Sequence, residues 1–190
     1  TSEVNKMKRK ILASAVLAAL LSTTALADTS SLSTTTTGMG VLENDYVRAG
    51  VNGTTGTFGS GGNTSPGLLY DSTGTGTFNT SYDYLTPGSP FDGFSVMIDG
   101  TNYTNNNTGT ASIANCDCTM GETMFDGNNH LIWYGMWTHG GSTWELANTY
   151  TLGETNPYID VETEIIAGSN ATTLSFGKYI DPDSQGMPGD

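Results

Sequence analysis

The chain has 190 residues, with 6 basic and 19 acidic side chains, 25 Gly, 6 Pro, 2 Cys and a formal net charge of −13. This length permits one domain of ordinary size or part of a larger one, and it excludes a multidomain machine. Two cysteines exclude a disulfide-dense miniprotein. A nucleic-acid partner is not expected, because phosphate contacts need clustered Lys and Arg.

The N-terminal segment 1–27 has the pattern of a secretory signal peptide. Met7 is followed by basic residues 8–10, an apolar run over residues 11–21 and the small-residue motif Ala25-Leu26-Ala27. We interpret residues 1–6 as a non-native or untranslated leader and residues 7–27 as the signal peptide, with cleavage between Ala27 and Asp28. The apolar run is about half of the ~20 residues that span a bilayer, so no transmembrane segment is expected in the mature chain. A membrane-anchoring amphipathic helix stays open as the alternative.

Removal of this leader makes the remaining chain more acidic. Residues 28–190 keep two basic residues, Arg48 and Lys178, against 18 acidic ones, for a net charge of −16. Such a chain repels anionic membranes and nucleic acid. The pattern predicts an exported protein of the periplasm, the outer surface or the extracellular space. Stabilisation by divalent cations between carboxylates is the alternative reason for the charge.

Period-two alternation of apolar residues predicts an all-β fold. Residues 28–40 are small, polar and Thr/Ser-rich, and we interpret them as a linker. No helical spacing follows, whereas apolar residues alternate with polar ones in many short runs. The apolar faces expected to be buried are Val47, Ala49 and Val51; Phe94, Val96 and Ile98; Leu131, Trp133 and Trp137; Trp144, Leu146, Tyr150 and Leu152; Ile159, Val161 and Ile165; and Leu174, Phe176 and Ile180.

Turn signals between these runs favour an antiparallel β-sandwich over residues 41–190, which could be part of a larger supersandwich. Asn52-Gly53, Asp92-Gly93, Asp99-Gly100 and Asp126-Gly127 are dipeptides that tolerate positive φ. The strongest hairpin candidate joins residues 130–138 to residues 143–152 through His139-Gly140-Gly141-Ser142. We expect the domain to be truncated at its C-terminus and to be a fragment of a longer protein.

A β-helix is the alternative fold. Thr55-Gly56-Thr57-Phe58 recurs as Thr75-Gly76-Thr77-Phe78, and the spacing of the two copies is compatible with one coil of a solenoid. Repeat folds need several copies, and no third copy is present.

Two groups of acidic residues are candidate sites. Asp181, Asp183 and Gln185, with Gly186 at the sixth position, match the opening of a calcium loop, although the fifth position is an amide. Ca²⁺ is therefore a possible cofactor, although none is certain, and an acidic Pro-Gly turn is the alternative. Asp160, Glu162 and Glu164 stand on one strand face, where paired carboxylates would serve glycoside hydrolysis or cation binding. A solvated face opposite the core is the simpler interpretation of this second row.

Cysteines and aromatic residues supply the remaining candidates. Cys116 and Cys118 are expected to form a local disulfide in an exported chain, with free thiols or a zinc site with His130 and His139 as alternatives. Aromatic rings stack on sugars, so Tyr134, Trp137 and Trp144 are candidate ligand-binding residues, and a core role is the alternative. The sequence contains no arguable Ser-His-Asp set and no phosphate-binding loop.

Residues 41–52 and 61–71, taken with the leader, the Thr/Ser linker and the acidic composition, resemble the N-terminal region of large exported bacterial surface proteins of the autotransporter or adhesin type. The resemblance implies a non-catalytic passenger or adhesin role with a glycan or a host or cell-surface ligand, and it supplies no catalytic residue. The composition and strand pattern are also similar to those of large sandwiches of the mutarotase or glycosidase-accessory type. A carbohydrate-active enzyme fragment and a calcium-stabilised structural module are therefore the alternative functions.

Overall fold

The computed structural model describes residues 31–34, 39–59, 65–85, 92–116, 122–123, 128–169 and 171–182. These residues form strands and one short 3-10 helix, η1 (Thr80–Tyr82). The strands are β1 (Ser31–Thr34), β2 (Met39–Glu43), β3 (Val47–Asn52), β4 (Leu68–Tyr70), β5 (Asp92–Ile98), β6 (Thr101–Asn106), β7 (Ala114–Asn115), β8 (Glu122–Thr123), β9 (Asn128–His139), β10 (Ser142–Gly153), β11 (Asp160–Ile166) and β12 (Leu174–Ile180). The signal peptide, its cleavage point and Asp126-Gly127 lie outside the described residues.

The strands form three antiparallel sheets. Sheet A has the order β1-β2-β3-β4, sheet B the order β12-β5-β6 and sheet C the order β11-β10-β9-β7, with β8 also paired to β9. Every strand pair is antiparallel, and none of the sheets closes into a barrel. The all-β, sandwich-like fold is confirmed. The β-helix alternative is wrong for the described residues, because its coils would stack strands in parallel.

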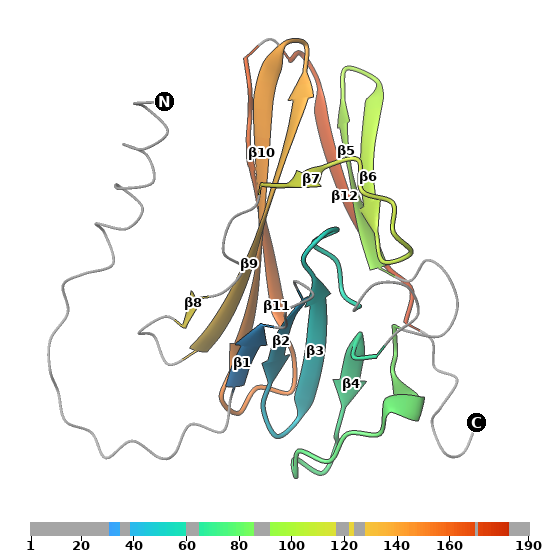
Figure 1. The fold of residues 1–190 in the computed structure, drawn as a ribbon, viewed down its shortest axis with the longest axis vertical. Helices are drawn as coiled ribbons and strands as arrows, with labels where there is room; N and C mark the ends of the chain where they lie inside the picture. Colours follow the sequence, from blue (N-terminus) through green and yellow to red (C-terminus); the bar gives the residue numbers. More distant parts are fainter. Residues whose placement is uncertain are drawn as a thin grey trace, which may run out of the picture.

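Sheet C faces both of the other sheets. Figure 1 shows β9 and β10 running along the long axis, with sheet A beside their lower part and sheet B beside their upper part. The first core joins residues of sheet A to Leu131, Tyr150 and Leu152 of the hairpin. The second core joins β5 to Trp133, Trp137, Trp144 and Leu146. One long hairpin is thus the common wall of two hydrophobic cores.

The predicted β9–β10 hairpin is present, and its turn is the two residues Gly140 and Gly141, because Ser142 pairs with His139. Trp144 pairs with Trp137 and Tyr150 with Leu131, so the alternating apolar residues of both strands share the inner face. Gly140 and Gly141 have φ of 58° and 78°, the two consecutive positive values of a type I′ turn. Asp99 and Gly100, at 48° and 81°, close the β5–β6 hairpin in the same way.

A partly buried turn over residues 53–56 contacts side chains of both cores. The Gly56 carbonyl accepts hydrogen bonds from Tyr150 Oη at 2.7 Å and Asn148 Nδ2 at 3.3 Å. The Gly53 carbonyl accepts one from Trp133 Nε1 at 2.9 Å. Gly56 has φ 64°, and a Cβ there would lie 2.2 Å from the Trp133 ring. Core side chains therefore satisfy the carbonyls of this turn, as buried backbone requires.

The apparent repeat is a shared local turn. Gly56 and Gly76 have similar positive φ values of 64° and 70°. Phe58 is buried, however, whereas Thr75 and Thr77 bind the carboxylate of Asp71 through hydrogen bonds. The two copies thus occupy different environments and do not stack as coils.

The chain path differs from the sequence predictions in three places. Part of the linker expected over residues 28–40 is strand, because β1 pairs with β2 and β2 begins at Met39. Thr and Ser backbones can extend a sheet edge without any apolar period. Asp92-Gly93 is not a turn: it begins β5, where Asp92 is buried. A Cβ at Gly93 would lie 2.1 Å from Tyr179 Oη, so glycine serves a close approach there.

The third difference lies in β12. The alternation predicts a buried face for Leu174, Phe176 and Ile180, but these residues are 46%, 40% and 48% exposed. Ile98 and Val96, which lie opposite Leu174 and Phe176, are fully buried in β5. The three residues lie at the margin of sheet B, where the described strands do not cover them.

Among the described residues, no helix is long and apolar enough to cross a membrane.

Candidate functional site

An open groove of about 590 Å³ lies on the surface of the described residues. It lies between β3, β4, the start of β11 and the end of β12. Its apolar lining includes Val47, Leu68, Ile159, Val161 and Ile180. Val161 lines it from the inner face of β11, opposite the exposed acidic face, and Ile159 lies directly before this strand. The groove thus follows from an apolar strand face that the sandwich covers incompletely.

Three tyrosines border the groove. Tyr158 and Tyr70 are 54% and 46% exposed, whereas Tyr84 is half-buried. Tyr70 ends β4, Tyr84 follows η1 and Tyr158 precedes β11, so three distant segments supply the rings. A tyrosine presents a broad apolar ring with a hydroxyl at its tip. This border can stack against a flat ligand and form hydrogen bonds at its periphery.

A buried carboxylate holds Tyr84 in place. Asp83 is 2% exposed and accepts backbone N–H bonds from Gly67 at 2.7 Å and from Leu68 and Leu85 at 3.0 Å. The Tyr84 N–H also donates to the Leu68 carbonyl at 2.9 Å. These bonds tie the segment after η1 to the start of β4, so two sides of the groove are fixed together.

A second carboxylate fixes the turn that follows Tyr70. Asp71 accepts hydrogen bonds from the backbone and hydroxyl groups of Thr73 and Thr75 and from the Thr77 N–H. The Thr73 hydroxyl and backbone N–H are the main cause of the lowered pKa of this carboxyl. The sequence contains a signal for this turn, because threonines follow Asp71 at every second position. Thr75 and Thr77 also belong to the apparent repeat, so the sequence alone suggests a repeat and not a turn held by a carboxylate.

A buried ion pair lies beside the groove. Lys178 lines the groove, and its Nζ lies 2.5 Å from Oδ1 of Asp92, which is fully buried. Oδ2 of Asp92 accepts the Phe58 N–H at 2.6 Å. Burial raises the pKa of Asp92, although Lys178 and these hydrogen bonds oppose the shift. Burial also raises the pKa of Tyr150 well above 10, with a smaller contribution from the charge of Asp92.

The predicted carboxylate row does not line the groove. Asp160, Glu162 and Glu164 are exposed on the outer face of β11, whereas Ile159 and Val161 face inward. In the described part of the chain, no group of three or more His, Cys, Asp or Glu residues could hold a metal ion. The arrangement matches the solvated-face interpretation of this row.

The predicted aromatic site lies in the second core. Trp137 and Trp144 are 7% and 1% exposed, and their rings stack with centroids 6.0 Å apart. Tyr134 is half-buried on the opposite face of β9. The two indole faces are covered by protein and are not free for a sugar. Period-two spacing places these rings correctly on one face of the hairpin but cannot distinguish core from surface.

The cysteine and histidine expectations fall partly outside the described residues. Cys116 is disulfide-bonded, and Cys118 is not described, so their pairing stays a prediction. A bonded Cys116 has no thiolate to offer zinc. His130 and His139 lie near opposite ends of β9, which separates them by roughly 30 Å, too far to share one ion.

The calcium expectation is only partly covered by the structure. Asp181 is exposed directly after β12, and Asp183 and Gln185 lie outside the described residues. The calcium loop stays a prediction. A melting temperature that rises in millimolar calcium relative to EDTA would support it, because an ion bound only by the folded state adds stability.

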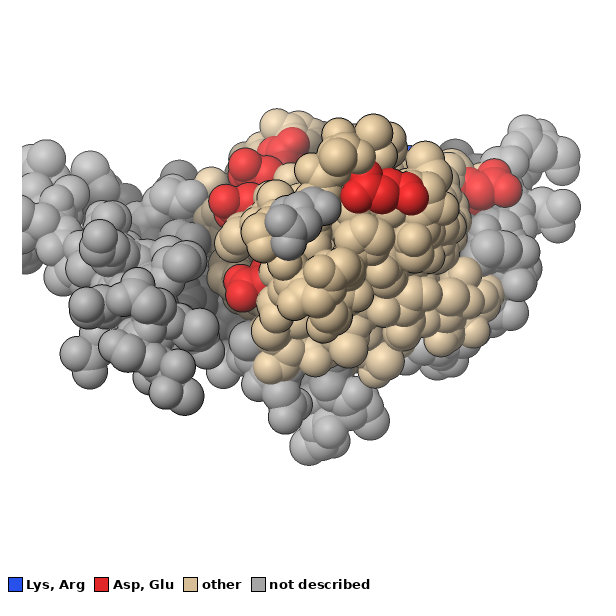
Figure 2. All heavy atoms as spheres, turned by 90° about the horizontal axis from the view of Figure 1, so that it is seen from above, with Lys and Arg blue, Asp and Glu red and all other residues tan. Residues whose placement is uncertain are grey.

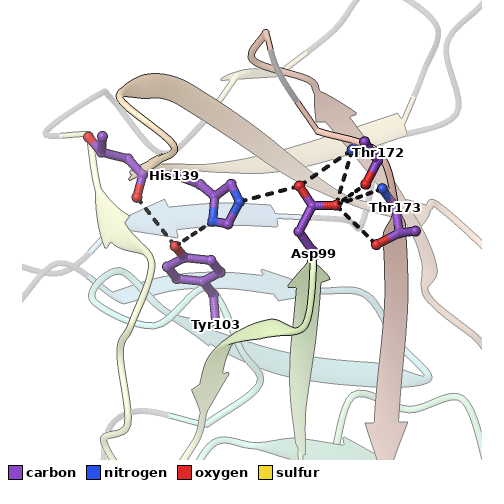
Figure 3. Close-up of polar contacts among 6 residues, drawn as sticks. Asp99, Tyr103, His139, Thr172 and Thr173 are labelled. Atoms are coloured by element: carbon purple, nitrogen blue, oxygen red, sulfur yellow. Dashed lines mark hydrogen bonds and ion pairs between the residues drawn. The ribbon is translucent and has the colours of Figure 1, made fainter.

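A polar cluster at the end of the sandwich has no counterpart in the sequence predictions. Figure 3 shows Asp99 between His139 and the threonines that precede β12. Oδ1 of Asp99 accepts both the N–H and hydroxyl groups of Thr172 and Thr173, at 2.7–3.2 Å. These bonds, the Thr172 hydroxyl first, lower the pKa of Asp99 to about 2. Oδ2 lies 3.8 Å from His139 Nε2, and His139 Nδ1 lies 3.1 Å from Tyr103 Oη.

This cluster is a structural tie between three loops. It joins the β5–β6 turn, the β9–β10 turn and the segment that leads into β12. A carboxylate, an imidazole and a hydroxyl follow one another as in a proton relay. However, the separation of Asp99 from His139 exceeds hydrogen-bond length, and Oδ1 of Asp99 is already occupied by its threonine donors. No sequence spacing could have identified the cluster, since its members come from separate hairpins.

Acidic side chains outnumber basic ones in this chain by 19 to 6. On the face seen in Figure 2, acidic residues stand among uncharged ones and basic residues hardly show.

Comparison with known proteins found no matching family model, no matching curated protein and no matching solved structure. Function is therefore inferred from the groove.

Proposed function

We propose that this chain is an exported, non-catalytic binding module and that its ligand is a glycan bound at the tyrosine-bordered groove. The single observation that carries the proposal is the groove itself, with Tyr70 and Tyr158 about half exposed at its border. The leader pattern and the acidic composition support export.

The chemistry of the groove favours a sugar ring. One face of a pyranose carries mainly C–H groups, which match an aromatic ring or an aliphatic wall, while its hydroxyls stay at the periphery. Tyr70, Tyr84 and Tyr158 supply rings with hydroxyl tips, and the apolar residues of β11 supply the wall. Lys178 is the basic residue of the lining, and it already pairs with Asp92. A neutral glycan therefore fits this groove better than an anionic one.

Glycan binding by the full chain tests this proposal. An array identifies the glycan, and titration calorimetry then compares the wild type with Tyr70→Ala and Tyr158→Ala. Each substitution should weaken binding about 5-fold, since loss of one stacking ring costs on the order of 1 kcal/mol. Tyr82→Ala is the matched control, because Tyr82 is 42% exposed but does not line the groove.

Two results would contradict the proposal. One is the absence of binding to every glycan on the array. The other is binding that Tyr70→Ala and Tyr158→Ala leave unchanged, which would place the glycan elsewhere on the chain. Circular dichroism of each variant confirms that the sheet structure is retained.

A further inference from the structure

The side chains of Lys178 and Asp92 are held close enough to react with one another. Nζ of Lys178 lies 2.5 Å from Oδ1 of Asp92, and a C=O bond is about 1.2 Å long, so Nζ lies within about 3.7 Å of the carboxyl carbon. Reacting atoms at about 3–3.5 Å are in a near-attack arrangement. Lys178 pairs with Phe94 and Ile180 pairs with Asp92 in the β12–β5 ladder. The ladder therefore keeps the amine beside the carboxyl group.

The surroundings of this pair favour its uncharged form. Asp92 is fully buried, Phe58 is 3% exposed, and the centroid of the Phe58 ring lies 5.6 Å from Nζ of Lys178. Burial raises the pKa of the Asp92 carboxyl. Because charges are costly in such surroundings, one proton can move from the ammonium to the carboxylate and leave a neutral amine beside a neutral carboxyl group.

A backbone donor points at the other oxygen of the same carboxyl group. The Phe58 N–H donates to Oδ2 of Asp92 at 2.6 Å. When an amine adds to a carboxyl carbon, negative charge collects on one oxygen, and fixed N–H donors stabilise that charge. Oδ1, which faces Lys178, is then the oxygen that takes up protons and leaves. The two oxygens of Asp92 thus have the separate partners that a condensation needs.

We propose that Lys178 and Asp92 condense to an amide that cross-links β12 to β5. In the neutral pair, the lone pair of Nζ attacks the carboxyl carbon, a C–N bond forms, and negative charge moves to Oδ2. Nζ then passes a proton to the Oδ1 hydroxyl, the C–Oδ1 bond breaks, and one water molecule leaves. Oδ2 remains as the amide oxygen, so atoms and charges balance without an added reagent. The groove that Lys178 lines gives the water a way out.

The ion pair is the resting state of the two side chains, and the amide accumulates from it slowly. Only molecules in which the proton has moved to Asp92 can react. Their fixed contact compensates for this, since well-oriented groups reach effective molarities of about 10⁵ M or more. Freshly folded protein therefore contains the ion pair, and aged protein contains the cross-link. The cross-link restricts the unfolded chain as a disulfide does, so aged protein should melt at a higher temperature.

Mass spectrometry of the full chain tests the proposal. Folded protein is held at neutral pH below its melting temperature, and its intact mass is followed over time. We expect a growing fraction that is lighter by one water molecule. Lys178→Arg is the matched control, because a guanidinium keeps the charge beside Asp92 but stays protonated and cannot attack the carboxyl carbon. The mass of this variant should stay constant.

Trypsin digestion after unfolding locates the bond. Beyond residue 10, the chain has basic residues only at Arg48 and Lys178, and trypsin does not cut after a lysine whose Nζ is part of an amide. Fresh protein should release peptide 179–190, and aged protein should release less of it in proportion to the lighter fraction. A succinimide at Asp99-Gly100 would also lose water, but it would leave Lys178 open to trypsin.

Wild type held in urea is a second control, because unfolding separates the two side chains without any change of sequence. It should keep releasing peptide 179–190 in full, and this comparison stands even if Lys178→Arg fails to fold. The proposal is overturned if folded wild type never becomes lighter. It is equally overturned if the lighter protein still releases peptide 179–190, or if Lys178→Arg loses the same mass.

Discussion

Replacement of Lys178 by methionine should destabilise the protein far more than an ordinary loss of one surface charge. Asp92 is fully buried, and Lys178 lies 2.5 Å from it with its side chain 22% exposed. The methionine side chain would retain most of the aliphatic volume but leave the Asp92 carboxylate without its counter-charge. Breaking a buried ion pair from one side costs about 3–5 kcal/mol. For a domain of this size, a loss of ~3 kcal/mol lowers the melting temperature by about 6–12 °C.

The pH dependence of this loss identifies its cause. Burial already raises the pKa of Asp92 with Lys178 present, and removal of Lys178 should raise it further. A raised pKa favours the protonated carboxyl in the folded state. The variant therefore loses stability as the pH rises above about 4, the pKa of an Asp carboxyl in the unfolded chain. Urea unfolding should therefore show a small difference from wild type near pH 4 and the full difference at pH 7.

A matched control separates this effect from loss of charge alone. Arg48→Met removes the other basic residue of the described chain, whose guanidinium lies 3.1 Å from Glu43 with both side chains partly exposed. That surface pair should be worth no more than about 1 kcal/mol. If Lys178→Met also costs no more than such a surface pair at pH 7, the account of Asp92 as a buried charge is refuted.

Three further predictions concern the turns and the titrating groups. Gly56→Ala should lower the free energy of unfolding in urea by more than about 2 kcal/mol, because its Cβ would clash with the Trp133 ring. Gly100→Ala, also at positive φ but in open space, should lower it by only about 1 kcal/mol. Equal losses for the two variants would contradict this prediction. The stability that ionised Asp99 supplies should be complete above pH 4 and lost as pH falls through its pKa of about 2, so Asp99→Asn should flatten the acid limb of the stability curve. Ultraviolet titration should find Tyr150 protonated until the protein unfolds above pH 10, and a tyrosine ionising near 10 that is absent from Tyr150→Phe would refute its burial.

Local patterns in the sequence were sufficient for the β9–β10 hairpin. Large apolar residues recur at period two on one face of each run, Trp133 and Trp137 in the first and Trp144 in the second. Gly140-Gly141 separates the two runs, so the pattern predicts both strands and the turn. The β9–β10 hairpin was therefore predictable, because every interaction that defines it is close in sequence. For the β5–β6 hairpin, the first strand and the Asp99-Gly100 turn were predicted, but the second strand was not.

Contacts between distant residues were not predictable. Asp92-Gly93 has the composition of a turn, but Asp92 pairs with Lys178, far along the chain, and this partner places it inside a strand. The exposure of Phe176 depends on which strands lie beside β12, and a single strand pattern carries no such information. For the same reason the tyrosines of the groove, which come from three segments, could not be grouped in advance.

Because one hairpin forms a wall of both hydrophobic cores, the two halves of the sandwich should not unfold independently. Separation of β9 from β10 would open both interiors at once, so their amides should exchange with solvent only through global unfolding. β12, held to β5 across a long stretch of intervening chain, should join late in folding and exchange sooner. Hydrogen exchange should thus reveal slow amides in the central hairpin and faster amides in β12.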